Sequence, residues 1–274
     1  MTRRFRRAMA AALLAALLAA PCLAAPDRPF PYELAKRDRW LLPASAGLLA
    51  LGGLLYERSA PITLGEIEAL DRDDVNAVDR PATYNWSPGW AEAGDLSRAA
   101  LLGSSVLVAA SPGLVGGRWS EALTLAAMAA ETFFAVGGVT ALAKAAVRRE
   151  RPYLYNTDLG LEERLAAGVD PRGSFISGHT SAAFAAAAFV STVATDLYGP
   201  STGTRLVWAA SLSLAALTAF ARVEAGLHFP TDAVVGAAAG FAIGWLVPAL
   251  HRKGRSDRLT VAVGPGLVGV GLTF

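Results

Sequence analysis

The chain has 274 residues, of which 53% are hydrophobic and 18% charged, and its formal net charge at pH 7 is +2. This composition lies outside the usual range of soluble proteins and indicates a membrane protein. The small net charge and the scattered lysine and arginine residues exclude a nucleic-acid-binding protein. The single cysteine, Cys22, excludes an intrachain disulfide and a cysteine-based zinc site.

The first 25 residues have the pattern of a secretory signal peptide. Four arginines within the first seven residues precede an apolar stretch at 8–20, and Leu23-Ala24-Ala25 offers a small-residue cleavage site. The alternative is an uncleaved first helix. The sequence leaves both readings open.

Six further apolar segments follow, and their lengths are close to the roughly 17 to 25 residues that a membrane-spanning helix needs. They occupy residues 40–56, 99–115, 122–147, 177–197, 206–221 and 233–250. The first is marginal, and Glu131 interrupts the third, where we expect it to pair with a neighbouring helix. We therefore predict an all-α polytopic membrane bundle of about six helices.

The remaining stretches define the expected domain boundaries. An N-terminal segment, 26–98, contains the marginal helix 40–56 and a polar loop, 57–98, with nine acidic residues against four arginines. A helical core occupies 99–250. The tail, 251–274, is basic at its start and carries β-branched residues and glycines around Gly264-Pro265-Gly266, a pattern that fits a short β-hairpin.

The basic tail predicts the sidedness of the bundle. Positive charge marks the cytoplasmic side, so counting back through three spans places the end of segment 122–147 in the periplasm of a bacterial inner membrane. A cleaved signal followed by six spans would place the tail outside. Either segment 40–56 does not fully cross the membrane, or the first apolar stretch does not translocate the N-terminus.

The end of the third apolar segment carries a group of cations. On a continuous helix, Lys144, Arg148 and Arg151 would share one face, and Pro152 would discourage further helix beyond them. Such a face suits a phosphate. Arginines at a membrane interface can equally serve as anchors, with their heads in water.

The fourth segment begins at Ser177-Gly178-His179. Ser177 is a good N-cap, Gly178 allows a ligand to approach the backbone, and the free N–H groups of a first helical turn favour an anion. A capping serine beside a structural histidine is the plainer alternative.

The junction of the fifth and sixth segments supplies Arg222, His228 and Asp232. A spacing of four lets Asp232 accept a hydrogen bond from one ring nitrogen of His228 if the local turn is helical, which would leave the other nitrogen as a nucleophile. Taken alone, the pair could also be a simple polar contact. Together the three clusters indicate one common site, since all are expected at helix ends on the same side of the membrane.

This constellation resembles the type 2 phosphatidic acid phosphatase superfamily, whose pattern is Lys-x6-Arg-Pro, Pro-Ser-Gly-His and Ser-Arg-x5-His-x3-Asp. The matching positions are Lys144 to Arg151-Pro152, Ile176-Ser177-Gly178-His179, and Ala221-Arg222 to His228 and Asp232. The resemblance covers about residues 99–250. Ile176 replaces the usual proline and Ala221 the usual serine, departures that concern loop geometry and phosphate hydrogen bonding.

The resemblance implies that Lys144, Arg151 and Arg222 bind the substrate phosphate, helped by Ser177 and the Gly178 backbone. It further implies the catalytic roles of the remaining three residues: His228 as the nucleophile, Asp232 as the group that orients it, and His179 as the acid that protonates the leaving oxygen.

Three fixed cations can stabilise a transferring phosphoryl group without a metal or other cofactor. The expected activity is therefore a metal-independent phosphatase that acts on a membrane lipid phosphate or diphosphate through a phosphohistidine. The alternatives are a soluble periplasmic acid phosphatase, a vanadate-dependent haloperoxidase, and a non-enzymatic membrane protein that binds lipid headgroups. The sequence does not predict an oligomeric state.

Overall fold

The computed structural model describes residues 28–58, 62–165, 170–254, 259–264 and 267–272. The expected signal segment, residues 1–25, lies outside this part of the chain. The six long helices are α2 (Asp38–Glu57), α4 (Pro88–Gly116), α5 (Trp119–Val147), α7 (Gly178–Tyr198), α8 (Thr202–Glu224) and α9 (Pro230–His251). The short elements are α3 (Leu64–Glu68), η2 (Arg72–Asp74), η3 (Arg80–Tyr84), η4 (Pro152–Tyr155), α6 (Leu161–Leu165), β1 (Leu259–Gly264) and β2 (Leu267–Leu272).

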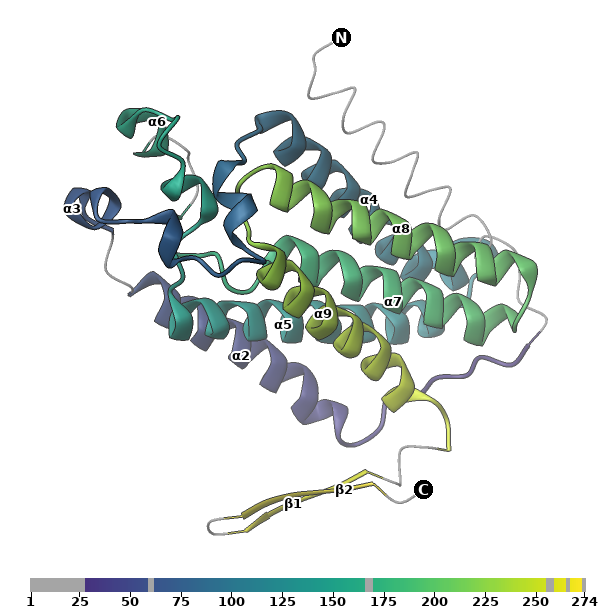
Figure 1. The fold of residues 1–274 in the computed structure, drawn as a ribbon. Coiled ribbons are helices and arrows are strands. Elements are labelled where there is room, and N and C mark those ends of the chain that lie inside the picture. Colours follow the sequence, from purple (N-terminus) through teal and green to yellow (C-terminus); the bar gives the residue numbers. More distant parts are fainter. Residues whose placement is uncertain (1–27, 59–61, 166–169, 255–258, 265–266, 273–274) are drawn as a thin grey trace.

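Helix α7 is the centre of the bundle. It packs against α4, α5, α8 and α9, whereas α2 packs against the outer side of α5. Phe189, Val190 and Val193 of α7 are fully buried. The short elements α3 and α6 gather at the end of the bundle where α7 and α9 begin (Figure 1). These packing relations confirm the predicted all-α bundle.

Glycines allow α7 and α9 to approach closely. A Cβ atom added at Gly236 would lie 2.8 Å from the carbonyl oxygen of Ser177, just before α7, and one added at Gly240 or Gly244 would lie 2.0 or 2.2 Å from a carbonyl oxygen of α7. Small residues at a helix interface let two backbones come close, as is common in membrane bundles. This contact fixes the start of α9 beside the start of α7, and both starts carry site residues.

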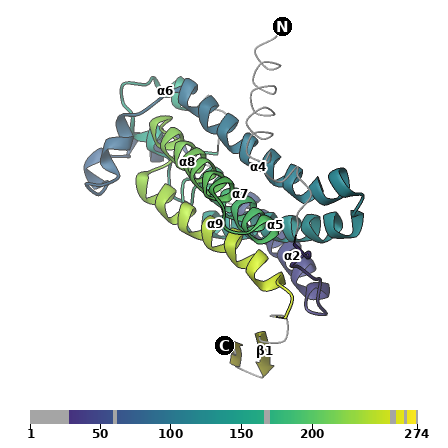
Figure 2. The same cartoon turned by 90° about the vertical axis from the view of Figure 1, so that its right-hand side faces the viewer.

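The outer faces of the long helices are apolar and exposed. Val106, Leu123, Leu206 and Val234, on four different helices, are all more than 60% exposed. In the described part of the chain, six helices are long and apolar enough to cross a membrane, including α2, whose sequence is marginal. The chain is a polytopic membrane protein. Residues 31–33, shortly before α2, and residues 251–253, at the end of α9, lie side by side through backbone hydrogen bonds, so α2 begins at the end of the bundle where α9 ends (Figure 2).

Helix α4 begins earlier than its apolar sequence predicts. It starts at Pro88, with Ser87 as N-cap accepting the Trp90 N–H at 3.3 Å, rather than near residue 99. The first three turns of the helix therefore come from the polar stretch that we expected to be a loop. Their polar side chains, Asp95 and Arg98 among them, lie at the end of the bundle where α7 begins, because Asp95 contacts His179 of α7.

The predicted C-terminal hairpin is confirmed. Strands β1 and β2 pair antiparallel, with Leu259 opposite Leu272 and Gly264 opposite Leu267. The centre of the expected turn, residues 265–266, lies outside the described residues.

Candidate active site

The three predicted clusters meet at one end of the bundle, where α5 ends and α7 and α9 begin. Backbone hydrogen bonds tie the loops together: the Ser174 N–H donates to the Arg149 carbonyl at 3.1 Å, and the Ser177 N–H to the Asp232 carbonyl at 3.2 Å. The Tyr153 N–H likewise donates to the Gly226 carbonyl at 2.9 Å. Residues far apart in the sequence are thus held at fixed separations.

The imidazole of His228 is fully buried and has a defined tautomer. Its Nδ1 lies 2.7 Å from the carbonyl oxygen of Ser174, an acceptor, so Nδ1 carries the proton. Its Nε2 lies 3.2 Å from Nη1 of Arg151, a donor, so Nε2 presents its lone pair. The ring is therefore oriented with Nε2 as its available nucleophilic atom.

The pKa of His228 lies well below the ordinary histidine value. Burial is the main cause, because it penalises the imidazolium, and the charges of Arg151 and Lys144 lower the pKa further, while Asp232 acts in the opposite direction. Nε2 therefore stays unprotonated at neutral pH, as a nucleophile requires.

Asp232 lies close to His228 but does not make the expected hydrogen bond. Its Oδ2 is 3.9 Å from Nδ1, because His228 precedes helix α9 and its Nδ1 faces Ser174 instead. The Asp232 carboxylate accepts hydrogen bonds from Ser174 Oγ at 2.5 Å and from the Phe229 N–H at 2.9 Å. Asp232 can orient His228 through Ser174. The Ser174 hydroxyl donates to Asp232, and the Ser174 carbonyl accepts from His228.

Arg149 holds Asp232 from the other side and was not predicted as a site residue. Its Nη1 lies 2.7 Å from Asp232 Oδ1 and its Nη2 lies 2.8 Å from Asp79 Oδ2. Asp79 in turn accepts from the backbone and hydroxyl of Thr231, at 3.0 and 2.6 Å. Burial acts to raise the pKa of Asp79, but the hydrogen bonds from Thr231, Arg149 and Asn76 lower it overall. A buried chain of alternating charges therefore supports the start of α9.

The predicted three-cation helix face is wrong. Helix α5 ends at Val147, and Arg148 follows as its C-cap in the left-handed conformation with φ of +50°. The chain then turns and is extended at Arg151. The turn lets Arg149 reach Asp79 and Asp232, contacts that a continuous helix would not allow.

Arg151 and Lys144 nevertheless both lie close to the predicted nucleophile. Arg151 is 6% exposed, and its guanidinium donates to the carbonyls of Asp170 and Leu227, each at 2.6 Å. Lys144 lies in the last turn of α5, with Nζ 5.6 Å from the centre of the Tyr56 ring. Two cations are thus placed near His228 by different elements.

Ser177 is the N-cap of α7, as predicted. Its Oγ accepts the Thr180 N–H at 3.4 Å and lies 2.9 Å from the Thr180 hydroxyl, and its side chain is completely buried. The hydroxyl is therefore engaged in capping. Gly178 is the first residue of the helix, and an added Cβ would lie 3.1 Å from the Thr140 side chain, so a larger residue would crowd this turn.

Asp95 of α4 links two of the predicted site residues. Its Oδ1 lies 2.9 Å from Nε2 of His179 and 3.1 Å from Nη1 of Arg222. Nε of Arg222 is buried without a hydrogen-bond partner among the described residues, so it can still donate to an anion. Asp95 was missed because the polar start of α4 was assigned to a loop.

A pocket of about 580 Å³ opens beside these groups. Lys144, Gly178, His179 and Arg98 contribute to its polar part. Leu102, Phe133 and Val136 contribute apolar side chains, and most of the lining surface is apolar. The pocket joins cations, an imidazole and a helix N-terminus to an apolar wall, which suits a molecule with an anionic head and a hydrocarbon body.

Comparison with known proteins agrees with this architecture. Residues 122–256 match the model of the PAP2 superfamily. The crystal structure of a transmembrane PAP2-type phosphatidylglycerolphosphate phosphatase from Bacillus subtilis is similar, with a TM-score of 0.50 and 20% identity. The match covers 78% of this chain and 98% of that one. A search of curated protein sequences gives no match. The family match over residues 122–256 spans all three clusters, so the part of the chain that holds the candidate site is similar to the PAP2 superfamily.

Proposed function

We propose that this protein is a metal-independent phosphatase that removes a phosphate from a membrane lipid phosphate or diphosphate. The observation that carries the proposal is the tautomer of His228. Its Nδ1 is held by the Ser174 carbonyl, and its Nε2 lone pair lies beside Arg151. A buried neutral imidazole surrounded by fixed cations is suited to attack a phosphorus atom.

The proposed reaction has two steps. In the first, Nε2 of His228 forms a bond to phosphorus while the bond from phosphorus to the lipid oxygen breaks, and His179 donates a proton to that oxygen. In the second, His179 takes a proton from a water molecule whose oxygen attacks phosphorus, which releases inorganic phosphate and restores the free His228. Lys144, Arg151 and Arg222 stabilise the charge on the non-bridging oxygens in both steps.

Asp95 has to release Arg222 for this reaction to proceed. In the free protein it accepts from both Arg222 and His179, and its side chain is 56% exposed, so it can rotate away. A phosphate that replaces it would accept from Arg222, including the unpartnered Nε.

A lipid substrate fits the shape of the site better than a soluble one. The pocket beside His179 is lined by Leu102, Phe133 and Val136, on helices that can cross the membrane. A hydrocarbon chain placed there would leave its phosphate near Lys144 and Gly178. The same feature opposes the reading as a soluble acid phosphatase. The Bacillus subtilis protein is titled a phosphatidylglycerolphosphate phosphatase, which makes phosphatidylglycerol phosphate one of the substrates to test.

We place the catalytic end on the periplasmic side of a bacterial inner membrane. Arg252 and Lys253 lie at the opposite end, together with Lys36, Arg37 and Arg39 at the start of α2. An excess of lysine and arginine residues favours the cytoplasmic face. A cysteine placed at the exposed Tyr84, in a background with Cys22→Ser, should react with a membrane-impermeant maleimide in intact spheroplasts. Labelling only after lysis would indicate that the catalytic end faces the cytoplasm instead.

The activity can be tested with detergent-purified protein and a substrate panel in the presence of EDTA. The panel is phosphatidic acid, phosphatidylglycerol phosphate, undecaprenyl diphosphate, lipid A and a soluble aryl phosphate. We expect phosphate release from at least one lipid and none from the His228→Ala variant. Release from the aryl phosphate alone would favour a non-specific phosphatase, and halide oxidation on adding vanadate would favour a haloperoxidase. Lipid binding without release would favour a non-enzymatic protein.

The polar stretch 57–98 borders the site through Asp79 and Asp95, so we propose that it helps to select the substrate. Exchange of this stretch with that of a related protein of different substrate preference should transfer part of that preference. An unchanged order of rates across the panel would contradict this role.

A further inference from the structure

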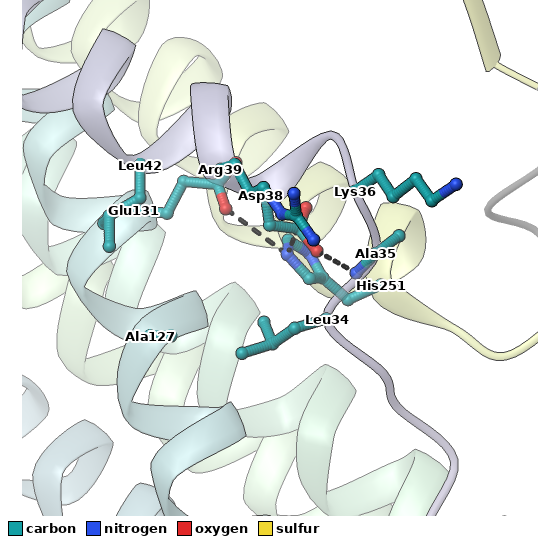
Figure 3. A pocket seen from close by; sticks show the side chains of 9 residues that line it. All are labelled: Leu34, Ala35, Lys36, Asp38, Arg39, Leu42, Ala127, Glu131 and His251. Atoms are coloured by element: carbon teal, nitrogen blue, oxygen red, sulfur yellow. Dashed lines mark hydrogen bonds and ion pairs between the residues drawn. The ribbon is translucent and has the colours of Figure 1, made fainter.

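A second cluster of polar side chains lies at the end of the bundle opposite the catalytic site. Asp38 begins α2, Glu131 lies on α5, and His251 ends α9, and the three line a pocket of about 400 Å³ (Figure 3). Asp232 and His251 are nineteen residues apart on α9, about 28 Å at the helical rise of 1.5 Å. This cluster therefore takes no direct part in the phosphatase chemistry.

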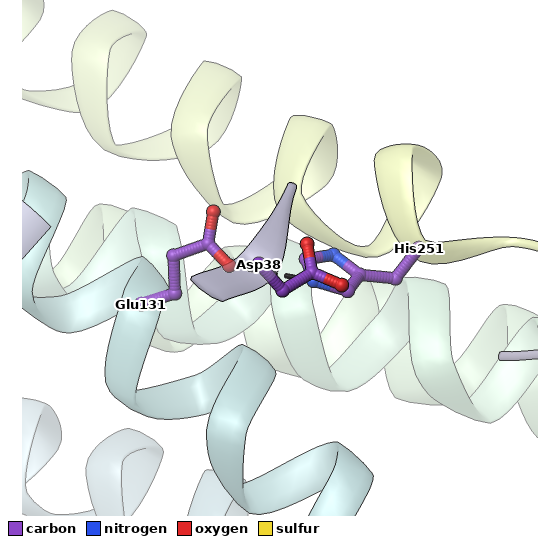
Figure 4. Close-up of side chains that lie close together, drawn as sticks. All are labelled: Asp38, Glu131 and His251. Carbon is purple, nitrogen blue, oxygen red and sulfur yellow. Dashed lines mark ion pairs between the residues drawn. The ribbon is translucent and has the colours of Figure 1, made fainter. Parts of the chain in front are cut away.

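The imidazole of His251 has one satisfied nitrogen and one that faces only acceptors. Its Nδ1 lies 2.8 Å from the Val247 carbonyl oxygen and therefore donates to it. Its Nε2 lies 3.2 Å from Asp38 Oδ1 and 3.4 Å from Glu131 Oε2 (Figure 4). The side chain is completely buried, and Nε2 has no hydrogen-bond partner among the described residues.

Nε2 of His251, Oδ1 of Asp38 and Oε2 of Glu131 all present lone pairs to one another, and a cation between them would relieve their repulsion. With His251 neutral, Asp38 and Glu131 bring two negative charges to one place, and Arg37, whose Nε is 3.6 Å from Asp38 Oδ1, brings one positive charge. Lys36 and Arg39 also line the pocket, with exposed side chains. The group directly around Nε2 thus keeps a net negative charge, which a proton or a metal ion can neutralise.

We propose that Asp38, Glu131 and His251 bind a divalent transition-metal ion of the zinc class. Metal bonds of about 2.0 to 2.1 Å at tetrahedral angles separate the ligand atoms by about 3.3 to 3.4 Å, close to the separations seen at Nε2. The 3.4 Å separation from Glu131 exceeds the usual range of about 2.7 to 3.2 Å for a hydrogen bond from an imidazolium, whereas the 3.2 Å separation from Asp38 fits either a hydrogen bond or a shared metal ion. One imidazole and two carboxylates form a donor set that suits zinc or its neighbours rather than magnesium or calcium.

The surroundings of the three ligands favour the same ion. A metal-binding histidine usually donates its second N–H to a carbonyl or carboxylate, as His251 does to Val247. Asp38 is held through its other oxygen, Oδ2, which accepts the Ala35 N–H. The three candidate ligand atoms already lie within 4.8 Å of one another. The pocket leaves room for water as a further ligand.

The site would connect α2 to α9, two helices that are not among the main packing pairs of the bundle. Helix α2 packs mainly against α5, and its side chains are the least buried of the six long helices. A metal ion bound by α2, α5 and α9 would tie the start of α2 to the end of α9. Its role would be structural, and its loss would loosen α2 without changing the catalytic groups.

The test compares metal binding by wild type, Glu131→Gln and a matched control, Glu121→Gln. Glu121 is a second carboxylate of α5, paired with Arg118 at 2.9 Å and outside the cluster. After stripping with a chelator, each protein is titrated with Co²⁺ while its visible d–d absorption is followed, and metal content after Zn²⁺ loading is measured by mass spectrometry. We expect one ion per chain in wild type and control, and an affinity at least about tenfold weaker in E131Q.

Folding is checked by circular dichroism and gel filtration, and Asp38→Asn provides a second ligand variant at the partly exposed edge of the site. We also expect Zn²⁺ to raise the melting temperature of stripped wild type and of E121Q but not of E131Q. Absence of Co²⁺ absorption in the wild type, or equal binding by E131Q and E121Q, would overturn the proposal and leave a proton as the bridging cation. Because metal binding is measured directly, this outcome is independent of whether the protein releases phosphate.

Discussion

Replacement of Arg149 by methionine is the perturbation with the most sharply defined expected effect. The guanidinium joins Asp79 and Asp232 at 2.8 and 2.7 Å, and the two carboxylates are 1% and 0% exposed. Methionine keeps much of the side-chain volume but removes the charge and every hydrogen-bond donor. Two buried carboxylates then lie near each other without the cation that separates them.

The size of the effect follows from the cost of leaving buried charge unpaired. Removing one partner of a buried ion pair costs about 3 to 5 kcal/mol. For a chain of this length, 1 kcal/mol corresponds to roughly 2 to 4 °C in melting temperature, so we expect a fall of roughly 6 to 20 °C. The turnover number should fall as well, because Asp232 would no longer be held in place beside Ser174.

A double-mutant cycle separates this explanation from a general packing defect. In wild type, Asp79→Asn should lower the melting temperature because it removes an ion pair, whereas in the R149M background it should raise it by removing an unpaired charge. Arg205→Met is the control, since Arg205 is exposed and donates to the Ser201 carbonyl at 3.3 Å. An R149M protein as stable as R205M, or an Asp79→Asn effect of the same sign in both backgrounds, would refute the reasoning.

Three further predictions concern the helix contact, the acid in the site and the pH profile. Gly240→Ala places a Cβ 2.0 Å from the Ser181 carbonyl oxygen and should cost about 1 to 3 kcal/mol of stability, whereas Gly47→Ala, which has nothing within 4 Å, should be neutral or stabilising by thermal melting. Asp95→Asn should make inhibition by inorganic phosphate about fivefold tighter, because two unit charges 4 Å apart in water repel by about 1 kcal/mol. The same substitution should lower the turnover number. Equal inhibition constants for wild type and the Asp95→Asn variant would contradict this reasoning. Because burial lowers the pKa of His228, kcat/KM should stay level as the pH falls through the ordinary pKa of histidine, about 6.5. A fall in kcat/KM on the acid side that begins at or above that pH would count against His228 as the nucleophile.

The sequence was sufficient to predict the bundle and the meeting of three residue clusters at one end of it. Long apolar segments predicted the helices, and the spacing of Lys144, Arg151, His179, Arg222 and His228 predicted which groups would meet. These signals are local. The length of an apolar segment decides whether its helix can cross the membrane, and polar residues at the helix ends then lie on the same side of the membrane. The N-cap role of Ser177 was likewise predictable from its place before an apolar run.

The contacts that orient the site were not predictable in this way. Arg149 was missed because only a left-handed turn at Arg148, absent from any helix-face argument, directs it toward Asp79. Ser174 acts through its backbone carbonyl, which carries no sequence signal. Asp95 was hidden by the polar start of α4, since hydropathy cannot distinguish a helix that emerges from the membrane from a loop.

The separate cluster at Asp38, Glu131 and His251 was also beyond sequence reasoning. Its members are spread over more than two hundred residues, and only the packing of α2 and α9 on α5 brings them together. Glu131 alone was recognised, as an acid inside a span that should pair with another helix, and the structure confirms a pairing with His251 of α9.

The most direct test of the central claim is to trap the phosphorylated protein. Purified wild type, and a His179→Ala variant in which the intermediate should accumulate, are mixed with the substrate found in the panel, quenched rapidly at alkaline pH and analysed by mass spectrometry. The account predicts a phosphoryl group on Nε2 of His228, because Nδ1 is held by Ser174, and no label in His228→Ala. Full phosphate release by His228→Ala, or a phosphoryl group on any other residue, would contradict it.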